Sequence, residues 1–395
     1  MVYCLGFRCP ALDSMEAATD RQERVSWWQQ SRLTKARVAV VGAGALGNEV
    51  LKNLALMGVG NVYVFDSDIV EISNLSRTVL FGKDTLGQSK AIVAADRASR
   101  MNVNPNSTTK GFVMDVVWDL GGGFLRKMDV VLGCLDNLEA RLAIGQSCYQ
   151  LSVPFIDGGI RELDGTVKLF RTGNGACMDC TIPPGRRAAL GNRHPCLGVP
   201  MGAPLEGSRP MPTVQVSSAI IAALMCQEAV KILHGRAVPF GSVLSWLGEI
   251  DHFDVLKLIR SPGCPTCAFP PRPVSELGVG AADTVGRLLG VASDGWRVRL
   301  PSPFIPQCGC RNCGASWAVS KPLHRCAYSD LSCGTCRTAQ FADPTRVSIL
   351  DSTVDPCLMG LPLLELGVPC GAVLFGERSE EIVLFELSND CADIN

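Results

Sequence analysis

The sequence is short of charged side chains, of aromatic side chains and of net charge. Charged residues make up 19% of the 395 residues and aromatic residues 6%, whereas 47% are hydrophobic. A chain this apolar can bury a large core, which argues against intrinsic disorder. The 37 basic and 38 acidic residues leave a net charge of −1, so no overall basic field attracts nucleic acid or an anionic membrane. The length predicts two or three domains.

Signals for membrane insertion and export are also missing. The apolar run at residues 219–226 is far shorter than the roughly 18 residues that a membrane span requires. The first residues, MVYCLGFRCP, lack the basic start and the apolar centre of a signal peptide. We therefore expect a cytoplasmic protein that binds neither membrane nor nucleic acid.

Cysteine, in contrast, is abundant, with 19 residues. Because the cytosol keeps thiols reduced, cysteine pairs there indicate metal sites or chemistry rather than disulfides. Four CxxC pairs fall into two sets. The second set, Cys310, Cys313, Cys333 and Cys336, has 19 residues between its pairs, which is typical of a zinc ribbon. Cys308, His324 and Cys326 lie close enough in the sequence to replace one of these ligands.

Strand and helix patterns alternate along the first 150 residues. Apolar runs at 37–42, 61–66 and 128–134 predict buried parallel strands, and 46–57, 90–101 and 138–151 predict helices. This alternation predicts an α/β fold, a Rossmann-like, doubly wound and mostly parallel sheet.

The pattern changes after residue 153. Residues 154–172 predict a β-hairpin that turns at Asp164-Gly165, and residues 213–234 predict an apolar helix. Between them, residues 183–212 are rich in Gly, Pro and Arg and predict a long loop.

A proline-rich stretch at 268–273 predicts a linker. We expect one domain at residues 1–270 and a second at 271–395. For the second we expect a helix at 276–289, a zinc ribbon and a terminal β-hairpin from 372–375 and 382–387. A ribbon this small buries little surface, so its metal would supply its folding energy.

A nucleotide-binding pattern joins the first predicted strand to the first helix. Gly42, Gly44 and Gly47 form GxGxxG, which allows a tight turn and brings phosphate to the N–H groups at a helix N-terminus. Asp66 ends the next strand, where a carboxylate can bind ribose hydroxyls. These features alone favour an NAD-dependent oxidoreductase. The sequence contains no GxxxxGK[ST] motif of a P-loop enzyme.

Further motifs favour a different enzyme. In order they are Asp66-Ser-Asp68, Ser73-Asn74-Leu75-Ser76-Arg77, Gly87-Gln-Ser-Lys90 and Cys134-Leu-Asp136-Asn137 with Arg141. Their order and spacing resemble the ThiF/MoeB/ubiquitin-activating enzyme superfamily. With Arg21-x-x-Arg24 upstream and the CxxC pairs downstream, the resemblance extends over about residues 20–267.

The resemblance implies an enzyme that uses ATP to adenylate the C-terminal carboxylate of a protein. It assigns Asp66 to the ribose, Asn74, Arg77 and Lys90 to phosphates, and Asp136 to Mg²⁺. Arg24 matches an arginine that reaches the ATP of the other subunit in a homodimer. The nucleotide-binding set is completed by Gly42, Gly44, Gly47, Asp68 and Asn137.

Each assignment has a structural alternative. Asn74 and Asp136 would each cap a helix, while Arg77 and Lys90 would be ordinary surface residues. The resemblance also implies a Cys₄ zinc site at Cys177, Cys180, Cys264 and Cys267. Such a closed site would join two chain segments and perform no chemistry.

Members of the superfamily differ in a later step. Some only adenylate a sulfur carrier, whereas others transfer the activated tail to their own cysteine as a thioester. Cys196 lies in the predicted loop where thioester-forming members carry this nucleophile, and Arg186, Arg187, Arg193 and His194 nearby would lower its pKa. The alternative is an incidental loop cysteine.

We therefore expect a homodimeric activating enzyme for a ubiquitin-like protein that ends in Gly, with ATP, Mg²⁺ and two structural Zn²⁺ ions. It would pass its product to a conjugating enzyme. The added C-terminal domain suggests a bacterial ubiquitin-like conjugation operon of the antiphage kind. The alternatives are a sulfur-carrier adenylyltransferase for molybdopterin or thiamine synthesis, a non-catalytic scaffold, and an NAD-dependent oxidoreductase.

Overall fold

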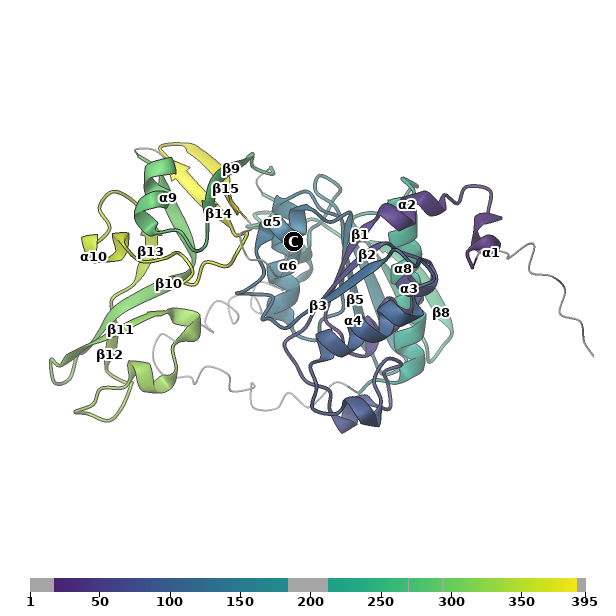
Figure 1. Ribbon diagram of the computed structural model, residues 1–395, viewed down its shortest axis with the longest axis horizontal. Helices are drawn as coiled ribbons and strands as arrows, with labels where there is room; N and C mark the ends of the chain where they lie inside the picture. The colour runs from purple at the N-terminus through teal and green to yellow at the C-terminus, as the bar shows by residue number, and fades with distance from the viewer. Residues whose placement is uncertain (1–17, 184–211, 269, 293–294, 389–395) are drawn as a thin grey trace, which may run out of the picture.

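The computed structural model describes residues 18–183, 212–268, 270–292 and 295–388. Their named strands form two sheets, one of eight strands and one of seven (Figure 1). The chain passes from the first sheet to the second between Lys257 and Val274.

The first sheet has the strand order β3-β2-β1-β4-β5-β6-β7-β8. Its strands are β1 Arg37–Val41, β2 Asn61–Phe65, β3 Thr108–Phe112, β4 Val130–Gly133, β5 Phe155–Arg161, β6 Asp164–Phe170, β7 Ser242–Leu247 and β8 His252–Lys257. Strands β1 to β5 are parallel and the last three are antiparallel. Because β1 lies between β2 and β4, a crevice opens beyond the carboxyl ends of β1 and β4. The predicted α/β fold is confirmed.

Helices cover both faces of this sheet. Helices α3 (Ala45–Leu56), α4 (Lys90–Met101) and α8 (Gln215–Leu233) pack on one face, and α5 (Gly122–Arg126) and α6 (Leu138–Gln150) on the other. The short helices α1 (Asp20–Glu23) and α2 (Gln30–Lys35) precede β1. Alternate β1 residues point to opposite faces, as strand geometry requires: Val38 and Val40 join the α3 side, and Ala39 and Val41 the α6 side.

Helix α8 is long and apolar enough to cross a membrane by length and composition, the one such helix among the described residues. A core helix of a soluble protein passes the same test, so this is weak evidence for a span. Here α8 packs against α3 and β5, and its Ile221, Ala222 and Met225 are fully buried. These contacts explain its composition without a membrane.

The second sheet has the order β11-β10-β14-β15-β9, with β12 and β13 also paired to β10. Its strands are β9 Val274–Gly280, β10 Arg297–Cys310, β11 Ser316–Pro322, β12 Ala342–Pro344, β13 Val347–Leu350, β14 Val373–Arg378 and β15 Glu381–Ser388. Helices α9 (Val285–Ala292) and α10 (Pro356–Met359) accompany it. The predicted terminal hairpin is confirmed as β14 and β15.

The helix predicted at residues 276–289 is wrong over its first half. Residues Val274–Gly280 form β9, which pairs in parallel with β15 from Leu384 onward, and the helix begins only at Val285. The pairing partner lies about a hundred residues away in the sequence, so a local pattern could not reveal it.

The hairpin after residue 154 turns two residues earlier than predicted. Arg161 pairs with Asp164, so Glu162 and Leu163 form the turn, and Glu162 adopts a φ of 53°. Gly165 instead lies in β6, where an added Cβ would come within 2.2 Å of Cγ1 of Ile221. The glycine is required for the close approach of α8 and not for the turn.

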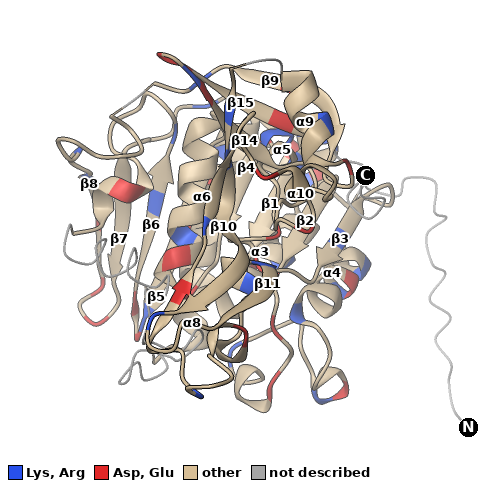
Figure 2. Ribbon diagram, turned by 90° about the vertical axis from the view of Figure 1, so that its left-hand side faces the viewer, with Lys and Arg blue, Asp and Glu red and all other residues tan. Residues whose placement is uncertain are grey.

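The second sheet docks on helix α5 of the first (Figure 1). The Gly123 N–H donates to the Gly371 carbonyl at 2.9 Å, and a Cβ on Gly121 would lie 2.1 Å from the Cys370 carbonyl oxygen. Leu384 of β15 belongs to the hydrophobic cluster on the α6 side of the first sheet. Lys and Arg are interspersed with Asp and Glu along the ribbon on the side of the second sheet (Figure 2), in line with the small net charge.

Candidate functional site

The three glycines of the GxGxxG turn have two different structural roles. Gly42 has a φ of +97°, and an added Cβ would lie 2.5 Å from the Cys134 carbonyl oxygen at the end of β4. A Cβ on Gly47 would lie 2.0 Å from the Gly42 oxygen, so both positions require glycine for packing. A Cβ on Gly44 would meet nothing within 4 Å. The open space beside Gly44, at the N-terminus of α3, suits an approaching phosphate.

Asp66 fastens the glycine turn to the end of β2. Its Oδ2 accepts a hydrogen bond from the Ala43 N–H at 2.7 Å and its Oδ1 accepts one from the Asp68 N–H at 2.8 Å. Burial raises the pKa of the Asp66 carboxyl; these two N–H groups and Lys90 oppose the rise, and Asp68 adds to it. The structure thus places Asp66 at the predicted nucleotide site, and its role toward ribose stays a prediction.

Lys90, Arg77 and Asn74 lie on the segment that follows β2. Lys90 Nζ pairs with Asp68 Oδ2 at 2.8 Å, and the Arg77 guanidinium donates to the Ser73 carbonyl. Asn74 is buried, and its Oδ1 accepts from the Glu71 N–H at 2.9 Å, capping the short turn Ile72–Asn74. Asn74 therefore caps a short turn, as the structural alternative stated. A contact between Asn74 and phosphate stays a prediction.

Asp136 and Asn137 follow β4, directly beside the glycine turn. Asn137 caps α6, because its Oδ1 accepts from the Ala140 N–H at 2.8 Å. The alternative in which Asp136 caps this helix is wrong. Asp136 is exposed, and its carboxylate forms no hydrogen bond or ion pair with the described residues. An exposed carboxylate on the segment that contacts the glycine turn at Gly42 is the donor type that Mg²⁺ prefers.

Arg24 is not brought to this site within one chain. It pairs with Asp20 at 2.8 Å, and its neighbour Gln22 donates to the Met57 carbonyl at the far end of α3. The 12 residues of α3 separate the two ends by about 18 Å. A contribution of Arg24 to a second subunit stays a prediction. Cys196 and its neighbours Arg186, Arg187, Arg193 and His194 lie outside the described residues.

The structure adds a charged cluster whose pairing the sequence motifs do not reveal. Arg141 Nη1 bonds both carboxylate oxygens of Asp157 at 2.7 Å, and its Nη2 donates to the Leu135 carbonyl. Asp157 is 1% exposed; burial raises its pKa, and Arg141 and Lys168 oppose the rise. Arg141 therefore ties the loop that carries Asp136 to strand β5. The sequence offered two separate indications, Arg141 after the Cys134–Asn137 motif and an aspartate inside an otherwise apolar strand, and no sign that they pair.

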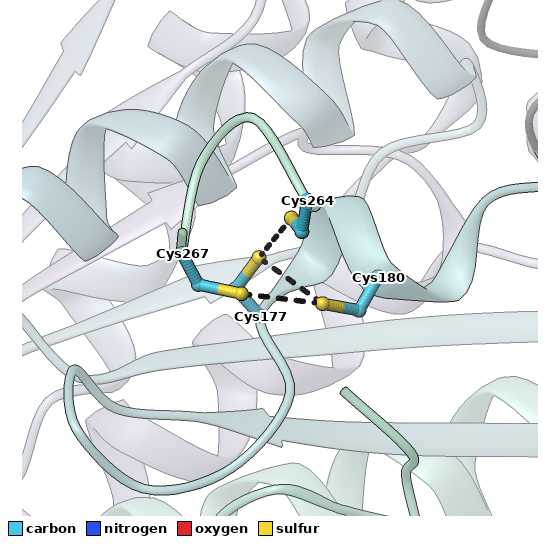
Figure 3. A group of neighbouring side chains, drawn as sticks. All are labelled: Cys177, Cys180, Cys264 and Cys267. Atoms are coloured by element: carbon cyan, nitrogen blue, oxygen red, sulfur yellow. Dashed lines mark hydrogen bonds between the residues drawn. The ribbon is translucent and has the colours of Figure 1, made fainter. Parts of the chain in front are cut away.

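The first cysteine set is assembled as predicted (Figure 3). The Sγ–Sγ distances are 3.8 Å for Cys177–Cys180, 3.6 Å for Cys177–Cys264 and 3.4 Å for Cys180–Cys267. A tetrahedral zinc with bonds of about 2.3 Å requires sulfur separations of about 3.8 Å, so the set fits Zn²⁺. The hydroxyl of Thr266 donates to Asp179 Oδ2 at 2.8 Å and links the two CxxC turns.

The second set is also assembled, from Cys310, Cys313, Cys333 and Cys336. Its Sγ atoms lie 3.8 Å apart for Cys310–Cys336 and 3.5 Å apart for Cys313–Cys333. None of the three alternative ligands joins it. Cys308 and Cys326 are buried in a hydrophobic cluster, and the His324 ring stacks on Trp118 with centroids 4.5 Å apart. The four predicted ligands therefore lie together, and their binding of a metal stays a prediction.

Comparison with known proteins agrees with this architecture. The ThiF family pattern matches residues 19–266. A sulfur carrier protein adenylyltransferase of Thermus thermophilus is 32% identical over 248 residues, 61% of this chain and 86% of that protein. A molybdopterin-synthase adenylyltransferase of Escherichia coli is 31% identical over 240 residues, 60% of this chain and 89% of that protein.

Two further similarities are more partial. SUMO-activating enzyme subunit 2 of Dictyostelium discoideum is 36% identical over 150 residues, 38% of this chain and 22% of that protein. The crystal structure of E. coli MccB shares the fold, with a TM-score of 0.52, 19% identity and coverage of 64% of this chain and 73% of that one. The glycine turn, the first cysteine set and the extent of the match together show that the chain belongs to the ThiF family.

Proposed function

We propose that this protein uses ATP to adenylate the C-terminal carboxylate of a ubiquitin-like protein and then captures the activated tail on Cys196 as a thioester. The observation that carries the first step is a convergence at one edge of the sheet. The open space at Gly44, the carboxylates of Asp66 and Asp136, and the ammonium of Lys90 all lie on segments that follow β1, β2 and β4. The names of the two adenylyltransferase relatives support the same chemistry.

In this step a carboxylate oxygen attacks the α-phosphorus of ATP and pyrophosphate leaves. Both reactants are anions, so the site must supply positive charge where they meet. Lys90 and Arg77 would supply it to the phosphates, with Asn74 and Asn137 beside them and Asp66 and Asp68 toward the ribose. Asp136 would hold Mg²⁺, which neutralises charge on phosphate oxygens when bound.

The second step would release AMP when a thiolate attacks the acyl carbonyl. Cys196 is proposed for this role, with Arg186, Arg187, Arg193 and His194 favouring its thiolate form. Among the buried cysteines, Cys134 and Cys226 are unsuited, because burial raises the pKa of Cys134 well above its ordinary value and that of Cys226 to about 12. A homodimer with Arg24 acting across it, and transfer to a conjugating enzyme, complete the proposal.

The rival function is sulfur-carrier adenylation without a thioester. It is favoured by the names of the two relatives that match most of their own length. The two functions differ in one product. Thioester formation predicts a reductant-sensitive adduct between enzyme and ubiquitin-like protein that Cys196→Ala abolishes while pyrophosphate exchange continues. If wild-type protein exchanges pyrophosphate but never forms the adduct, the rival is correct.

ATP–pyrophosphate exchange, measured with a panel of purified ubiquitin-like and sulfur carrier proteins that end in Gly-Gly, tests the adenylation step. Asp136→Ala should lower the exchange rate by on the order of 100-fold while the protein stays folded. Asp96→Asn is the matched control, because Asp96 is a surface carboxylate paired with Arg100 on α4. Equal exchange by both variants would contradict the assignment of Asp136.

A further inference from the structure

One row of residues crosses the first sheet from the nucleotide crevice to its outer strand. Gly133 of β4 pairs with Asp157 of β5, Asp157 with Lys168 of β6, Lys168 with Val243 of β7, and Val243 with Leu256 of β8. Gly133 is the last residue of β4, so Asp157 and Lys168 lie level with the carboxyl edge. Residues that pair directly across strands project to the same face. Lys168 therefore lies on the side of the sheet that carries Arg141 and Asp157.

The charges of this cluster do not balance. Asp157 supplies one carboxylate, and Arg141 already bonds both of its oxygens. Lys168 is half-buried, and no carboxylate of the described residues lies within ion-pair distance of its ammonium group. Burial lowers the pKa of Lys168; Asp157 opposes this shift and Arg141 adds to it. A half-buried ammonium beside a guanidinium is stabilised by a further anion.

The position of Lys168 distinguishes between the anions of the reaction. Phosphates belong at Gly44 and Lys90, on the side of β1, β2 and α3. Lys168 is two strands beyond β4 in the opposite direction, about 10 Å from Gly133 at the usual strand spacing. The row continues to Leu256, which is 53% exposed on the outer strand. A protein tail that enters over β8 and β7 would reach Lys168 before it reaches the phosphates.

We propose that Lys168 binds the terminal carboxylate of the protein substrate and positions it for adenylation. The inference rests on the proposed function and assigns a substrate-binding residue to it. Arg141 and Asp157 orient this group: Arg141 occupies the Asp157 carboxylate, which leaves the Lys168 ammonium available for the tail.

The test measures the preference of the enzyme for a carboxylate over a carboxamide. A carrier protein that supports pyrophosphate exchange is prepared with a C-terminal carboxylate and, by semisynthesis, with a C-terminal carboxamide. Binding of each form is measured by calorimetry without ATP. Wild-type protein should bind the carboxylate form about ten- to a hundredfold more tightly, the range for a charge-assisted hydrogen bond. Lys168→Met should lose this preference, and Lys168→Arg should retain most of it.

Lys257→Met is the matched control, because Lys257 is exposed on β8 but, as the residue after Leu256, projects to the opposite face of the sheet. The carboxylate preference of this variant should equal that of the wild type. Lys168→Met should raise the KM for the carrier and leave the KM for ATP unchanged, a separation that general misfolding would not produce. If the wild type catalyses pyrophosphate exchange and Lys168→Met still prefers the carboxylate form, the role of Lys168 is wrong while the proposed function stands. If no carrier supports exchange in the wild type, the proposed function itself fails, and this inference fails with it.

Discussion

Each of the two sheets is accompanied by a four-cysteine site, but the two sites join very different lengths of chain. In the first, Cys177 and Cys264 are 87 residues apart, and three of the four ligands are buried. In the second, Cys313 and Cys333 are 20 residues apart, and Cys313 is exposed. A bound metal would fasten the end of the ThiF-family region onto its centre in the first case and would only close a local ribbon in the second.

The second site also lies in a part of its sheet that has little hydrophobic core. The ribbon has a small hydrophobic cluster of its own, with Ile305 and Leu323 among its members, whereas the sheet that carries it has a larger one around Val298 and Phe304. Within the second sheet, only the ribbon is therefore expected to depend on a metal for its folding, because the rest of that sheet has a core of its own. The same ligand set can stabilise tertiary structure or local structure, depending on what lies between its cysteines.

The largest expected effect follows from breaking the first site. Cys264→Ser should remove one of two zinc ions per chain and lower the free energy of unfolding by roughly 2–5 kcal/mol, as loss of a structural cross-link does. Elemental analysis and denaturant unfolding measure both quantities. A variant that retains two zinc ions, or that unfolds like the wild type, would show that the site is not a structural staple.

Breaking the second site should affect a smaller part of the molecule. Cys333→Ser should remove the other zinc ion and disorder the ribbon, while pyrophosphate exchange and unfolding of the first sheet stay as in the wild type. Hydrogen exchange resolved by segment, together with elemental analysis, separates the two regions. Loss of pyrophosphate exchange would mean that the adenylation site needs an intact ribbon, which would contradict this comparison of the two sites.

A still smaller effect is expected at the joint between the sheets. Arg126 pairs at 2.5 Å with both Glu276 and Glu386, and Glu386 is buried. Arg126→Met leaves Glu386 without its cation and should cost about 1–3 kcal/mol. Calorimetry should then resolve separate transitions for the two sheets. An unchanged single transition would show that the glycine contacts of α5 are sufficient to couple them.

The smallest effect is expected at a second ion pair across the same joint. Arg325 and Asp119 lie 3.3 Å apart, and their side chains are 48% and 38% exposed. Arg325→Gln should change the free energy of unfolding by no more than about 0.5 kcal/mol, because water screens exposed pairs. It is the control for Arg126→Met in the same assay. A change as large as that of Arg126→Met would mean that burial of Glu386 does not explain the difference.

The sequence predicted elements well where a local period or a short motif carries the information. Helices 46–57, 90–101, 138–151 and 213–234 were each confirmed within two residues at either end. Both cysteine sets were also predicted, since CxxC spacing is a local property. Prediction failed at β9, because its strand pairing with β15 is not local, and at Asp164-Gly165, where a turn motif serves helix packing instead.

The residues of the candidate site likewise fall into those that motifs located and those that only the structure could place. The glycine turn, Asp66, Lys90 and Asp136 could be located from motifs, because each follows a strand whose carboxyl end faces the same crevice. The bonds of Asn74 and Asn137 to backbone N–H groups could not be foreseen in detail, since Asn serves equally as a cap and as a ligand. A role for Lys168 could not be predicted from the sequence, because it depends on the alignment of Lys168 with Asp157 and Gly133 across three strands.

The sequence by itself determined the α/β class, the nucleotide turn, the two cysteine sets and the family. Each of these depends on residues that are close in the chain or on the order of short motifs. Only the tertiary structure decided which cysteines stay out of the ribbon site, how α5 receives the second sheet, and that Arg141, Asp157 and Lys168 share one face beside Asp136. Those relations depend on strand register and helix docking between distant segments, and hydrophobic periodicity contains no information about either.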